Sequence, residues 1–480
     1  MERLQTEQAE KVFGFFHQIA EIPRGSGNEK QIADFLCAFA QERQLYYYRD
    51  SVHNVLIKAP ATPDRVGAEP VILQGHTDMV CESTEPYDFQ TRGIVPVESG
   101  TWLHAQQTTL GADNGIAVAM MLALLDGGPG ASHPPLECLF TTQEETGLIG
   151  AGKFDYSKVT AKRMINLDSE DEGRACVGCA GGCRCDFFRE VRRADADPNP
   201  IVLRITAKGF AGGHSGMDIA KGRTSANVLL STVLAEAWHK AKNAPCLYAF
   251  SGGKMDNAIA RSAQAVISCD AQTDAFLRQR CADYQDTFSA DDRDGTLCCE
   301  PLEAPGEMPL SLQDADAFLS LCQALPYGVI RFSETLDGLV DTSANFGVCR
   351  VSGEGISLAV SIRAIEAAEK EKLKTRLQTV ADTWGFSLSF RGDYPGWTYH
   401  DDSPIKELYL RTYRALYGAE PVIETIHAGL ECGVIQSHIP GLDAISIGPD
   451  MEHVHTPAER LSIPSVKRVF AHLKYMLEEM

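Results

Sequence analysis

Histidine and carboxylate side chains recur in this sequence where short apolar runs end. The run VILQG is followed by His76 and, two residues later, by Asp78. The run LECLFTTQ is followed by the adjacent acids Glu144 and Glu145, and MIN is followed shortly by Asp168. Imidazoles and carboxylates are the ligands that zinc and similar divalent ions take in proteins. Any one of these positions is typical of a capped or solvated turn, but their repetition at successive strand ends predicts a metal site.

Two further segments extend this set of residues. Asp113 lies between a glycine-containing turn and a helix expected to begin near Gly115, and His453 and His455 follow the apolar run AISIG. In an open α/β sheet, ligands bind beyond the carboxyl ends of the strands. We therefore expect the candidate side chains to gather at one edge of a sheet to which these apolar runs belong.

The adjacent acids Glu144 and Glu145 can serve one site in two ways. Neighbouring side chains in a strand point to opposite faces, so both reach a common site only if the strand has already ended. Gly147 provides the turn. One acid would then bind metal while the other accepts a proton as a general base. His76 and Asp78 lie on one side of an extended backbone, which suits a ligand and a carboxylate that orients it.

The whole chain excludes several classes of protein. Its 480 residues, 44% hydrophobic and 23% charged, are typical of a soluble globular protein with two or three domains. The formal net charge of −21 leaves no excess of Lys and Arg to neutralise phosphates, so no nucleic-acid partner is expected. No run approaches the roughly 20 apolar residues that span a bilayer. The amphipathic N-terminus lacks a signal-peptide core, so we expect a cytoplasmic protein with no membrane partner.

The fifteen cysteines, in a chain without an export signal, are expected to be reduced thiols. Cys176, Cys179, Cys183 and Cys185 form the cluster CVGCAGGCRC, for which a metal or redox site is the alternative interpretation. Only three residues separate the two pairs, too few to arrange four ligands from one segment around a tetrahedral ion. We therefore favour incidental thiols, and metal analysis of a Cys176/Cys179 double variant tests the alternative.

The elements that position these residues change character along the chain. Residues 1–182 alternate helical patterns with short apolar runs, which predicts an α/β sheet flanked by helices. Residues 183–392 contain alternating strands such as IVLRITAKGF and GISLAVSIRA, each followed by a helix. The equivalent positions of SCDA and SIRA favour two copies of one α+β unit, of the ferredoxin-like kind. After YPGW the α/β pattern resumes over residues 393–480, so the sequence predicts one α/β domain interrupted by an inserted domain.

A family resemblance rests on motifs that occur in this order along the chain: GHTDMV, TLGADNGIAVA, EETGLIGA, NLDSEDEG, GGHSGMDI, HAGLECG and HTPAE. With them the sequence resembles peptidase D, the aminoacyl-histidine (Xaa-His) dipeptidase family of the di-zinc aminopeptidase/carboxypeptidase superfamily. The resemblance spans essentially the whole chain, and HAGLECG and YPGW are rather specific to that branch. It implies a zinc-peptidase catalytic domain (residues 1–182 and 393–480) and an inserted lid domain (residues 183–392).

The resemblance also implies a role for each candidate residue. Two divalent metal ions, zinc above all with manganese or cobalt as alternatives, would be held by His76, Asp113, Glu145, Asp168 and His455. Asp113 would bridge the ions, with Asp168 beside His76 on the first and His455 beside Glu145 on the second. Asp78 would orient His76, and Glu144 would be the general base. A cis peptide bond is implied between Asp113 and Asn114, whereas His453 has no counterpart in the family pattern.

Residues of the inserted domain and of one loop are implied to meet the substrate. His214 in GGHSGMDI would stabilise the oxyanion, and Asn257 and Arg363 would hold the substrate's carbonyl and carboxylate. Gly429 and Glu431 in HAGLECG would belong to a substrate-contacting loop of the catalytic domain. Taken alone, these residues are typical of turns, a helix cap, a solvated acid and a surface charge. If the lid is a doubled unit, His214 is expected to act within its own chain, whereas in relatives with a single-unit lid it comes from a partner subunit.

The expected function is hydrolysis of unblocked dipeptides, including Xaa-His, by attack of metal-bound hydroxide with Glu144 as general base. The alternative is a carboxypeptidase or N-acyl-amino-acid deacylase on the same scaffold, against which Asp168, rather than a glutamate, argues. A metal- or peptide-binding protein without catalysis would lack a ligand or the base, and none is missing. A small peptide is the expected partner, and a homodimer is left open.

Overall fold

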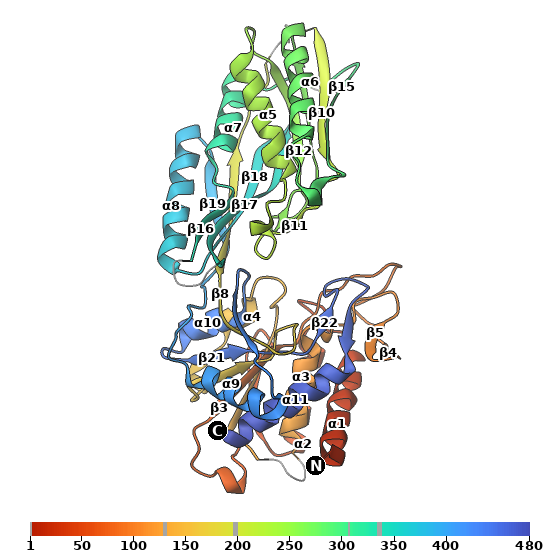
Figure 1. The fold of residues 1–480 in the computed structure, drawn as a ribbon, viewed down its shortest axis with the longest axis vertical. Coiled ribbons are helices and arrows are strands. Elements are labelled where there is room, and N and C mark those ends of the chain that lie inside the picture. Colours follow the sequence, from red (N-terminus) through yellow and green to blue (C-terminus); the bar gives the residue numbers. More distant parts are fainter. Residues whose placement is uncertain (1, 128–131, 195–199, 306–307, 334–337) are drawn as a thin grey trace. The chain divides into compact units, whose positions relative to one another are not determined.

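The computed structural model describes residues 2–127, 132–194, 200–305, 308–333 and 338–480. The chain divides into two compact units (Figure 1). Unit 1 comprises Met1–Cys179, Trp397–Thr425 and Leu430–Met480, and unit 2 comprises Ala180–Gly396 and Ile426–Gly429. Unit 2 thus begins three residues before the insertion expected at 183–392, ends four residues after it, and also contains the short segment 426–429.

The apolar runs of unit 1 form the expected α/β sheet. Within the described residues it has eight strands in the order β1-β2-β6-β3-β7-β21-β8-β20. The central strands β6, β3, β7 and β21 run parallel, so the residues that follow them meet at one edge of the sheet. The strands are β1 (Tyr46–Arg49), β2 (Val55–Ala59), β3 (Val71–His76), β6 (Leu136–Thr141), β7 (Arg163–Asn166), β8 (Arg174–Cys179), β20 (Val422–Ile426) and β21 (Asp443–Ser446).

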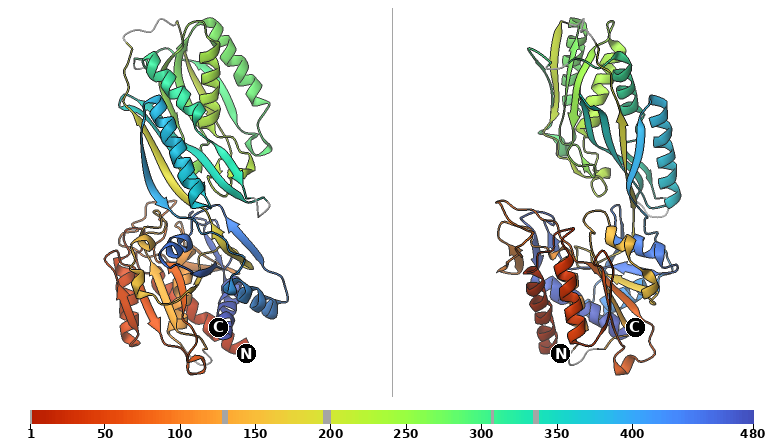
Figure 2. Two further views of the ribbon diagram at one scale, coloured as in Figure 1. Left: turned by 90° about the vertical axis from the view of Figure 1, so that its left-hand side faces the viewer. Right: turned by 180° about the vertical axis from the view of Figure 1, so that it is seen from behind.

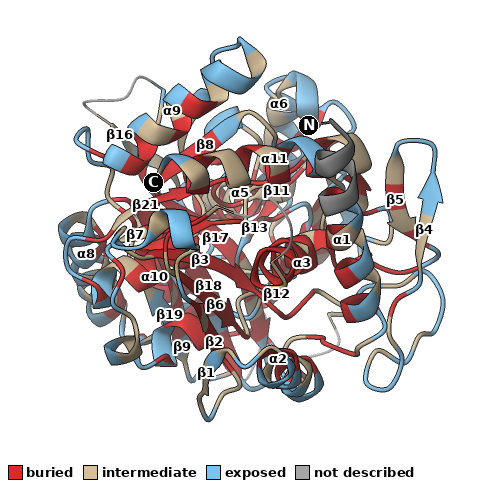
Figure 3. Ribbon diagram, turned by 90° about the horizontal axis from the view of Figure 1, so that it is seen from below, coloured by how far each residue is buried: buried red, intermediate tan, exposed pale blue. Residues whose placement is uncertain are grey.

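Burial explains why the central strands are continuous apolar runs. Strands β3 and β6 are buried along their whole length (Figure 3), as is usual for parallel strands covered on both faces. Helix α3 (Ala112–Leu125) is apolar on nearly every side and packs against both β3 and α1 (Glu2–Ala20). The expected fold class, a mixed sheet flanked by helices, is confirmed for this part of the chain.

The remaining elements of unit 1 surround this sheet. A small second sheet, in the order β22-β23-β5-β4, joins two distant parts of the sequence. Its strands are β4 (Pro96–Ser99), β5 (Trp102–Ala105), β22 (Met451–Glu452) and β23 (Arg460–Ser462). The other helices are α2 (Lys30–Glu42), α4 (Ile149–Lys153), α9 (Pro404–Tyr417), α10 (Glu431–His438) and α11 (Ile463–Glu479), with 3-10 turns η1 (Pro63–Arg65) and η2 (Tyr156–Lys158).

Unit 2 is built on one long antiparallel sheet. The order of its main path, within the described residues, is β15-β10-β14-β12-β17-β18-β9-β19, and β16 (Gly328–Phe332) pairs with β17. The strands are β9 (Gly181–Arg189), β10 (Ile201–Lys208), β12 (Cys246–Gly252), β14 (Ala263–Cys269), β15 (Thr296–Pro301), β17 (Val340–Ser352), β18 (Gly355–Ala364) and β19 (Ser387–Tyr394). Strands β11 (Gly213–His214) and β13 (Ala258–Ile259) form a separate pair. The 3-10 turns are η3 (Ile219–Lys221) and η4 (Ala290–Asp292).

This sheet contains two ferredoxin-like units, one nested inside the other. The inner unit runs β10, α5 (Ala226–Lys240), β12, β14, α6 (Ala271–Gln285) and β15. The outer unit begins with β9 and resumes with α7 (Leu312–Ala324), β17, β18, α8 (Ala367–Trp384) and β19. Each has the strand order 4-1-3-2, and the second strands, β12 and β17, pair to make one sheet (Figure 2). The segments SCDA and SIRA, expected at equivalent points, both end the third strand of a unit.

The cysteine cluster is divided between the two units. Cys176 and Cys179 lie on β8, and Cys183 and Cys185 lie on β9. All four side chains are buried, and the candidate metal-ligand sets in the described part of the chain include no cysteine. This arrangement favours the interpretation as incidental thiols. Among the described residues, no helix combines the length and apolarity that crossing a bilayer requires.

Candidate metal centre

The carboxylate of Asp113 lies between two imidazoles in unit 1. Its Oδ1 is 3.0 Å from Nε2 of His76, and its Oδ2 is 2.9 Å from Nε2 of His455. Asp113 follows the left-handed residue Gly111 (φ 69°) at the start of α3, and the implied cis peptide bond between Asp113 and Asn114 is present. His455 lies beyond β21 and β22, so segments 342 residues apart in sequence meet on one carboxylate.

Asp168 and Glu145 complete a cluster around this carboxylate. Oδ1 of Asp168 is 3.5 Å from Nε2 of His76, and Oε1 of Glu145 is 2.9 Å from Nε2 of His455. The structure therefore brings together every residue expected as a ligand, and the expected base. Potential ligand atoms within 4.8 Å of one another occur in the sets His76–Asp113–Asp168, Asp113–Glu145–His455 and His76–Glu144–Glu145. His453 belongs to none of these sets in the described part of the chain.

Asp78 contacts both sides of the cluster from a fully buried position. Nδ1 of His76 is 3.1 Å from the backbone oxygen of Asp78 and 3.4 Å from its Oδ1. Donation from Nδ1–H to these oxygens leaves Nε2 available to a metal ion. The same carboxylate accepts hydrogen bonds from the peptide N–H groups of Glu144 (3.0 Å) and Glu145 (3.3 Å) and from the hydroxyl of Ser26 (2.8 Å). Sequence reasoning predicts the first contact but misses the others.

The acids Glu144 and Glu145 lie in a turn just beyond β6, as the sequence predicts. The strand ends at Thr141, and the backbone then passes through Gln143 in the left-handed region (φ 53°). The N–H of Gly147 donates to the carbonyl of Glu144 at 2.9 Å and closes the turn. Because the backbone has changed direction, carboxylate oxygens of both neighbouring residues lie within 4.8 Å of a ring nitrogen of His76.

The cluster concentrates negative charge in a buried volume. Burial raises the pKa of Glu144 well above its ordinary value and raises the pKa of Glu145 to about 7. Burial would lower the pKa of both imidazoles, but neighbouring carboxylates raise the pKa of His76 well above its ordinary value and that of His455 to about 11. The cluster therefore favours positive charge beside its carboxylates. Divalent cations fit this donor set, because they bring positive charge to nitrogen and oxygen ligands.

A buried hydrogen-bond network joins the strands that carry these residues. Oε2 of Glu431, at the start of α10, accepts from Nε2 of Gln74 (2.5 Å) and from Oγ1 of Thr141 (2.6 Å). Oε1 of Gln74 accepts from Nδ2 of Asn166 at 2.6 Å. Glu431 is fully buried, and burial raises its pKa to about 8. Sequence reasoning misses Gln74, Thr141 and Asn166, since polar residues inside apolar runs carry no signal of their distant partners.

Unit 2 holds His214 and Arg363 next to each other. Nε2 of His214 is 3.3 Å from Nη2 of Arg363, and Nη1 of Arg363 donates to the hydroxyl of Tyr394 at 2.9 Å. Nδ1 of His214 accepts from the N–H of Met217 at 3.1 Å, which leaves the ring proton on Nε2, beside a guanidinium donor. Two donors that face each other favour an anionic acceptor, such as an oxyanion or a carboxylate.

Asn257 and Gly429 also lie in unit 2. The carbonyl of Asn257 accepts a hydrogen bond from the N–H of Ser215, next to His214, and its side chain is exposed. A Cβ on Gly429 would come within 2.8 Å of the Tyr394 ring, so only glycine allows this approach. The HAGLECG motif is divided between the units, because Glu431 begins α10 of unit 1. The sequence-based expectation placed both residues in the catalytic domain.

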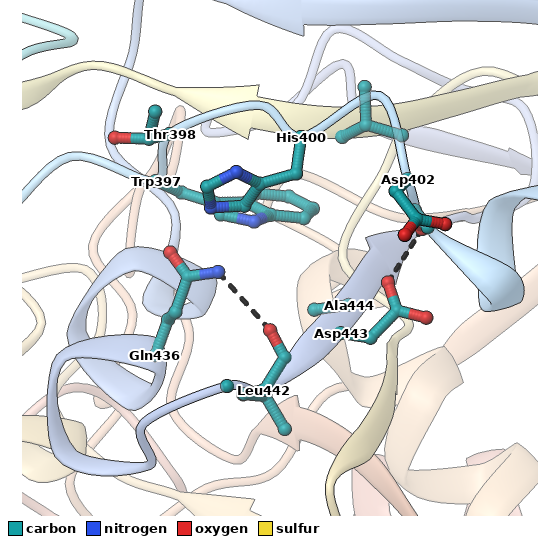
Figure 4. Close-up of a pocket in the computed structure, with 11 residues that line it drawn as sticks. Trp397, Thr398, His400, Asp402, Gln436, Leu442, Asp443 and Ala444 are labelled. Carbon is teal, nitrogen blue, oxygen red and sulfur yellow. Dashed lines mark hydrogen bonds between the residues drawn. The ribbon is translucent and has the colours of Figure 1, made fainter.

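A pocket of about 410 Å³ in unit 1 lies at the other end of β21. Its lining includes Asp443, the first residue of β21. His455 lies in the segment beyond Ser446, the last residue of that strand. The carboxylate of Asp443 accepts from Oγ of Ser403 at 2.6 Å, at the start of α9, so this acid stabilises a helix start. The pocket is lined by residues that include Trp397, Thr398, His400, Asp402, Gln436 and Leu442 (Figure 4).

The fold and the buried cluster define a metal-dependent hydrolase. The chain belongs to peptidase family M20/M25/M40, whose family model matches residues 72–479. The resemblance expected from the sequence motifs is thereby confirmed at the level of the family.

Two relatives that are more than 30% identical and match along the whole chain are named as dipeptidases. The cytosol non-specific dipeptidase of Escherichia coli (strain K12) is 34% identical over 485 aligned residues, which cover 100% of this chain and 99% of that protein. The aminoacylhistidine dipeptidase of Vibrio alginolyticus has a similar structure, with a TM-score of 0.86, 32% identity, and coverage of 98% of this chain and 96% of that one. The aminopeptidase PepT of Bacillus cereus shares the fold, with a TM-score of 0.57, 17% identity and 98% of both chains covered.

Proposed function

We propose that this protein is a metal-dependent dipeptidase that hydrolyses unblocked dipeptides, including Xaa-His. Its family, and the names of the two relatives that are more than 30% identical, support this substrate class. The observation that carries the metal-dependent chemistry is the position of Asp113, whose two carboxylate oxygens lie 3.0 and 2.9 Å from the imidazoles of His76 and His455. One carboxylate directed at two separate ligand sets suits a pair of cations.

Two divalent ions, most suitably zinc with manganese or cobalt as alternatives, would share the oxygens of Asp113. His76 and Asp168 would complete one set of ligands, and Glu145 and His455 the other. When bound, such ions lower the pKa of a water ligand from about 15.7 towards about 7 and polarise a carbonyl group. These ligand roles follow the distances within the cluster and the family resemblance.

The remaining residues of unit 1 would move and hold protons. Glu144 is the general base: its carboxylate accepts a proton from the attacking water and returns it to the leaving amine. Asp78 keeps the proton of His76 on Nδ1 and fixes the backbone of Glu144. The catalytic domain expected at residues 1–182 and 393–480 would thus correspond to unit 1, without the segments 180–182, 393–396 and 426–429 that belong to unit 2.

Unit 2 would act as a lid domain that supplies groups for the substrate. The N–H donors of His214 and Arg363, 3.3 Å apart, suit the developing oxyanion and the carboxylate of a dipeptide. Asn257 would hold the substrate's carbonyl, and Gly429 and Glu431 would belong to the adjoining substrate loop. Because the sheet of unit 2 contains two ferredoxin-like units, we propose that His214 acts within its own chain.

Asp113→Ala tests the two-ion proposal. Removing the shared carboxylate should abolish binding of both ions together and lower the melting temperature of the metal-loaded protein, because metal binding favours the folded state. Metal content after dialysis against zinc measures this directly. A variant that keeps two ions at wild-type affinity would rule out the bridging role. Exposed Asp88→Ala, on a surface loop of the same unit, is the control.

A substrate panel tests the dipeptidase assignment. Zinc-loaded protein should hydrolyse free dipeptides, Xaa-His among them, and leave their N-acetylated forms intact. Preferential cleavage of the N-acylated forms would replace the proposal with a deacylase or carboxypeptidase.

We also propose a cytoplasmic location, which the name of the cytosol enzyme of Escherichia coli supports. A homodimer is the oligomeric state to test, by light scattering.

A further inference from the structure

The acid of the HTPAE motif, Glu459, contacts the turn that presents Asp113. The carboxylate of Glu459 is buried, with the residue 2% exposed, and it accepts hydrogen bonds from four consecutive peptide N–H groups. Oε2 accepts from Leu110 (2.8 Å) and Gly111 (3.0 Å), and Oε1 accepts from Ala112 (2.8 Å) and Asp113 (3.4 Å). One side chain from a segment almost 350 residues away therefore satisfies donors that the start of α3 leaves without helical partners.

Arg24 holds the carbonyl groups of the same region. Its Nη2 donates to the carbonyl of Gly111 at 2.5 Å, and its Nη1 donates to the carbonyls of Thr77 (3.0 Å) and Asp78 (3.3 Å). The guanidinium is buried, with Arg24 2% exposed. Arg24 therefore connects the turn before Asp113 to the residues that directly follow His76 on β3.

The turn depends on these two side chains because its own backbone is not helical. Asp113 (ψ 108°) and Asn114 (ψ 29°) depart from helical geometry, so the first N–H groups cannot all be satisfied within α3. Gly111 is required at its position, since a Cβ there would come within 2.6 Å of Nη2 of Arg24. The Glu459 segment is itself fixed, because β23 begins at Arg460 and pairs with β5.

The short spacing between His455 and Glu459 in HTPAE links the backbone contact of Glu459 to the geometry of the metal centre. His455 and Glu459 belong to one short segment, and that segment contacts Asp113 twice. The imidazole of His455 meets the carboxylate of Asp113 at 2.9 Å, while the carboxylate of Glu459 holds its backbone. A displacement of the turn therefore moves the shared carboxylate relative to both imidazoles.

We propose that Glu459 and Arg24 are positioning residues that fix the carboxylate of Asp113 between His76 and His455. The inference rests on the proposed two-ion function, since it assigns these residues to the geometry of that site. Neither side chain is placed among the metal ligands or at the substrate. Their contribution is preorganisation: with the turn held, little backbone order has to be gained when the ions bind.

A second buried acid, Glu137, serves as a control that distinguishes a positioning role of Glu459 from a general contribution to stability. Glu137, 3% exposed, accepts hydrogen bonds from the peptide N–H groups of Thr160 (2.9 Å) and Ala161 (3.0 Å). It lies near the start of β6, whereas Glu144 and Glu145 follow the end of that strand. Glu137→Gln and Glu459→Gln therefore make the same chemical change at two buried acids that accept peptide N–H groups, one far from the ligands and one behind them. Glu137 also forms an ion pair with Lys58 at 2.7 Å, so its substitution tests the loss of at least as many contacts.

Zinc titration of chelator-stripped protein, with a urea unfolding curve of the same metal-free samples, tests the proposal. Both variants should unfold at lower urea concentrations than the wild type. Glu459→Gln alone should weaken the affinity for both ions, by about 10–100-fold, as is typical when an outer partner of a ligand is removed. Wild-type zinc affinity in Glu459→Gln, or an equal loss in Glu137→Gln, would overturn the positioning role.

Arg24→Lys provides a second measurement should Glu459→Gln fail to fold. Lysine keeps the positive charge but lacks the two-pronged geometry that reaches Gly111 and Thr77 together, so zinc affinity should again fall. Unchanged affinity in a folded Arg24→Lys variant would contradict the proposal. Wild-type protein that binds no divalent ion would instead refute the proposed function, so the two failures are distinguishable.

Discussion

The peptide N–H of Glu144 donates a hydrogen bond to Oδ1 of Asp78 at 3.0 Å. The acid that contacts the imidazole of His76 therefore also holds the backbone of the proposed general base. Asp78 follows β3 and Glu144 follows β6, two strands that pair in parallel, so one buried carboxylate ties together the ends of both. Ligand geometry and base geometry are consequently linked through Asp78.

Asp78→Asn should damage the site in both respects. The amide offers N–H groups where Glu144 and Glu145 need acceptors, and it weakens the orientation of His76. We expect zinc affinity to fall by about 10–100-fold and activity at saturating zinc to remain below wild type. Zinc titration and kcat at several zinc concentrations measure the two effects. Full recovery of kcat at saturating zinc would show that the contact with Glu144 is dispensable.

Glu144→Gln should separate catalysis from metal binding. The amide removes a proton acceptor, and general acid–base catalysis contributes about 10²–10⁴-fold, so kcat should fall by that factor. Zinc content should stay near two ions per chain. Glu145→Gln is the matched comparison, because it removes a proposed ligand and should lose zinc and activity together. Loss of zinc in Glu144→Gln would reassign that residue as a ligand.

His214→Ala should lower kcat without changing zinc content or the urea midpoint. Loss of an oxyanion donor costs about 10²–10³ in kcat, and the ring also leaves its position beside Arg363. Steady-state kinetics with an Xaa-His dipeptide give the split between kcat and KM. An unchanged kcat would remove His214 from the mechanism.

Mixing two inactive variants tests whether His214 serves its own chain. Equal amounts of His214→Ala and Glu144→Gln protein should remain inactive if both residues act within one chain. Each single variant, incubated alone, is the control for slow changes in activity. Recovery of activity on mixing would show that subunits exchange this histidine, contrary to the within-chain proposal.

Acid should destabilise unit 1 through His472. This residue of α11 is 3% exposed, is packed against Tyr409 and Tyr413, and burial lowers its pKa to about 4. An unfolded histidine has a pKa of about 6.5, so between these values the unfolded chain binds a proton that the folded chain does not. The free energy of unfolding should therefore fall as pH drops from about 6.5 to about 4, by about 3 kcal/mol from this group.

The difference between wild type and His472→Gln isolates this contribution. Urea midpoints of metal-stripped protein from pH 7 to pH 4 should fall less steeply in the variant, which has no imidazole to charge. His400→Gln, which removes an exposed imidazole of the same unit, is the control. Equal slopes for wild type and His472→Gln would contradict the burial argument.

Local pattern was enough to predict most of the candidate ligands, because His76, Glu145 and Asp168 stand at or shortly after the end of an apolar run. The end of a buried strand is visible in sequence, and parallel strands bring their ends to one edge. The partners behind the ligands were not predictable in this way. Gln74, Asn166 and Glu459 each form hydrogen bonds to residues far away in the chain, and no residue type or spacing identifies such a partner.

The internal organisation of the lid was likewise predictable only in part from the sequence. The equivalent placement of SCDA and SIRA indicated a repeated α+β unit, but not that one copy interrupts the other. The units are nested because the whole inner unit lies in sequence between β9 and the strands that pair with it, β18 and β19. Likewise, HAGLECG is one motif in sequence, yet contacts assign Gly429 and Glu431 to different units.

The sequence by itself determined the family, the strand ends and the residue types of the metal centre, since these depend on local order along the chain. Only the tertiary structure decided that one carboxylate lies between two imidazoles, that Asp78 holds the backbone of the proposed base, and that Glu459 fixes the turn before Asp113. These relationships depend on strand register and on contacts across hundreds of residues. Strand pairing and burial select these relationships during folding. They leave no periodic pattern in the sequence from which they could be predicted.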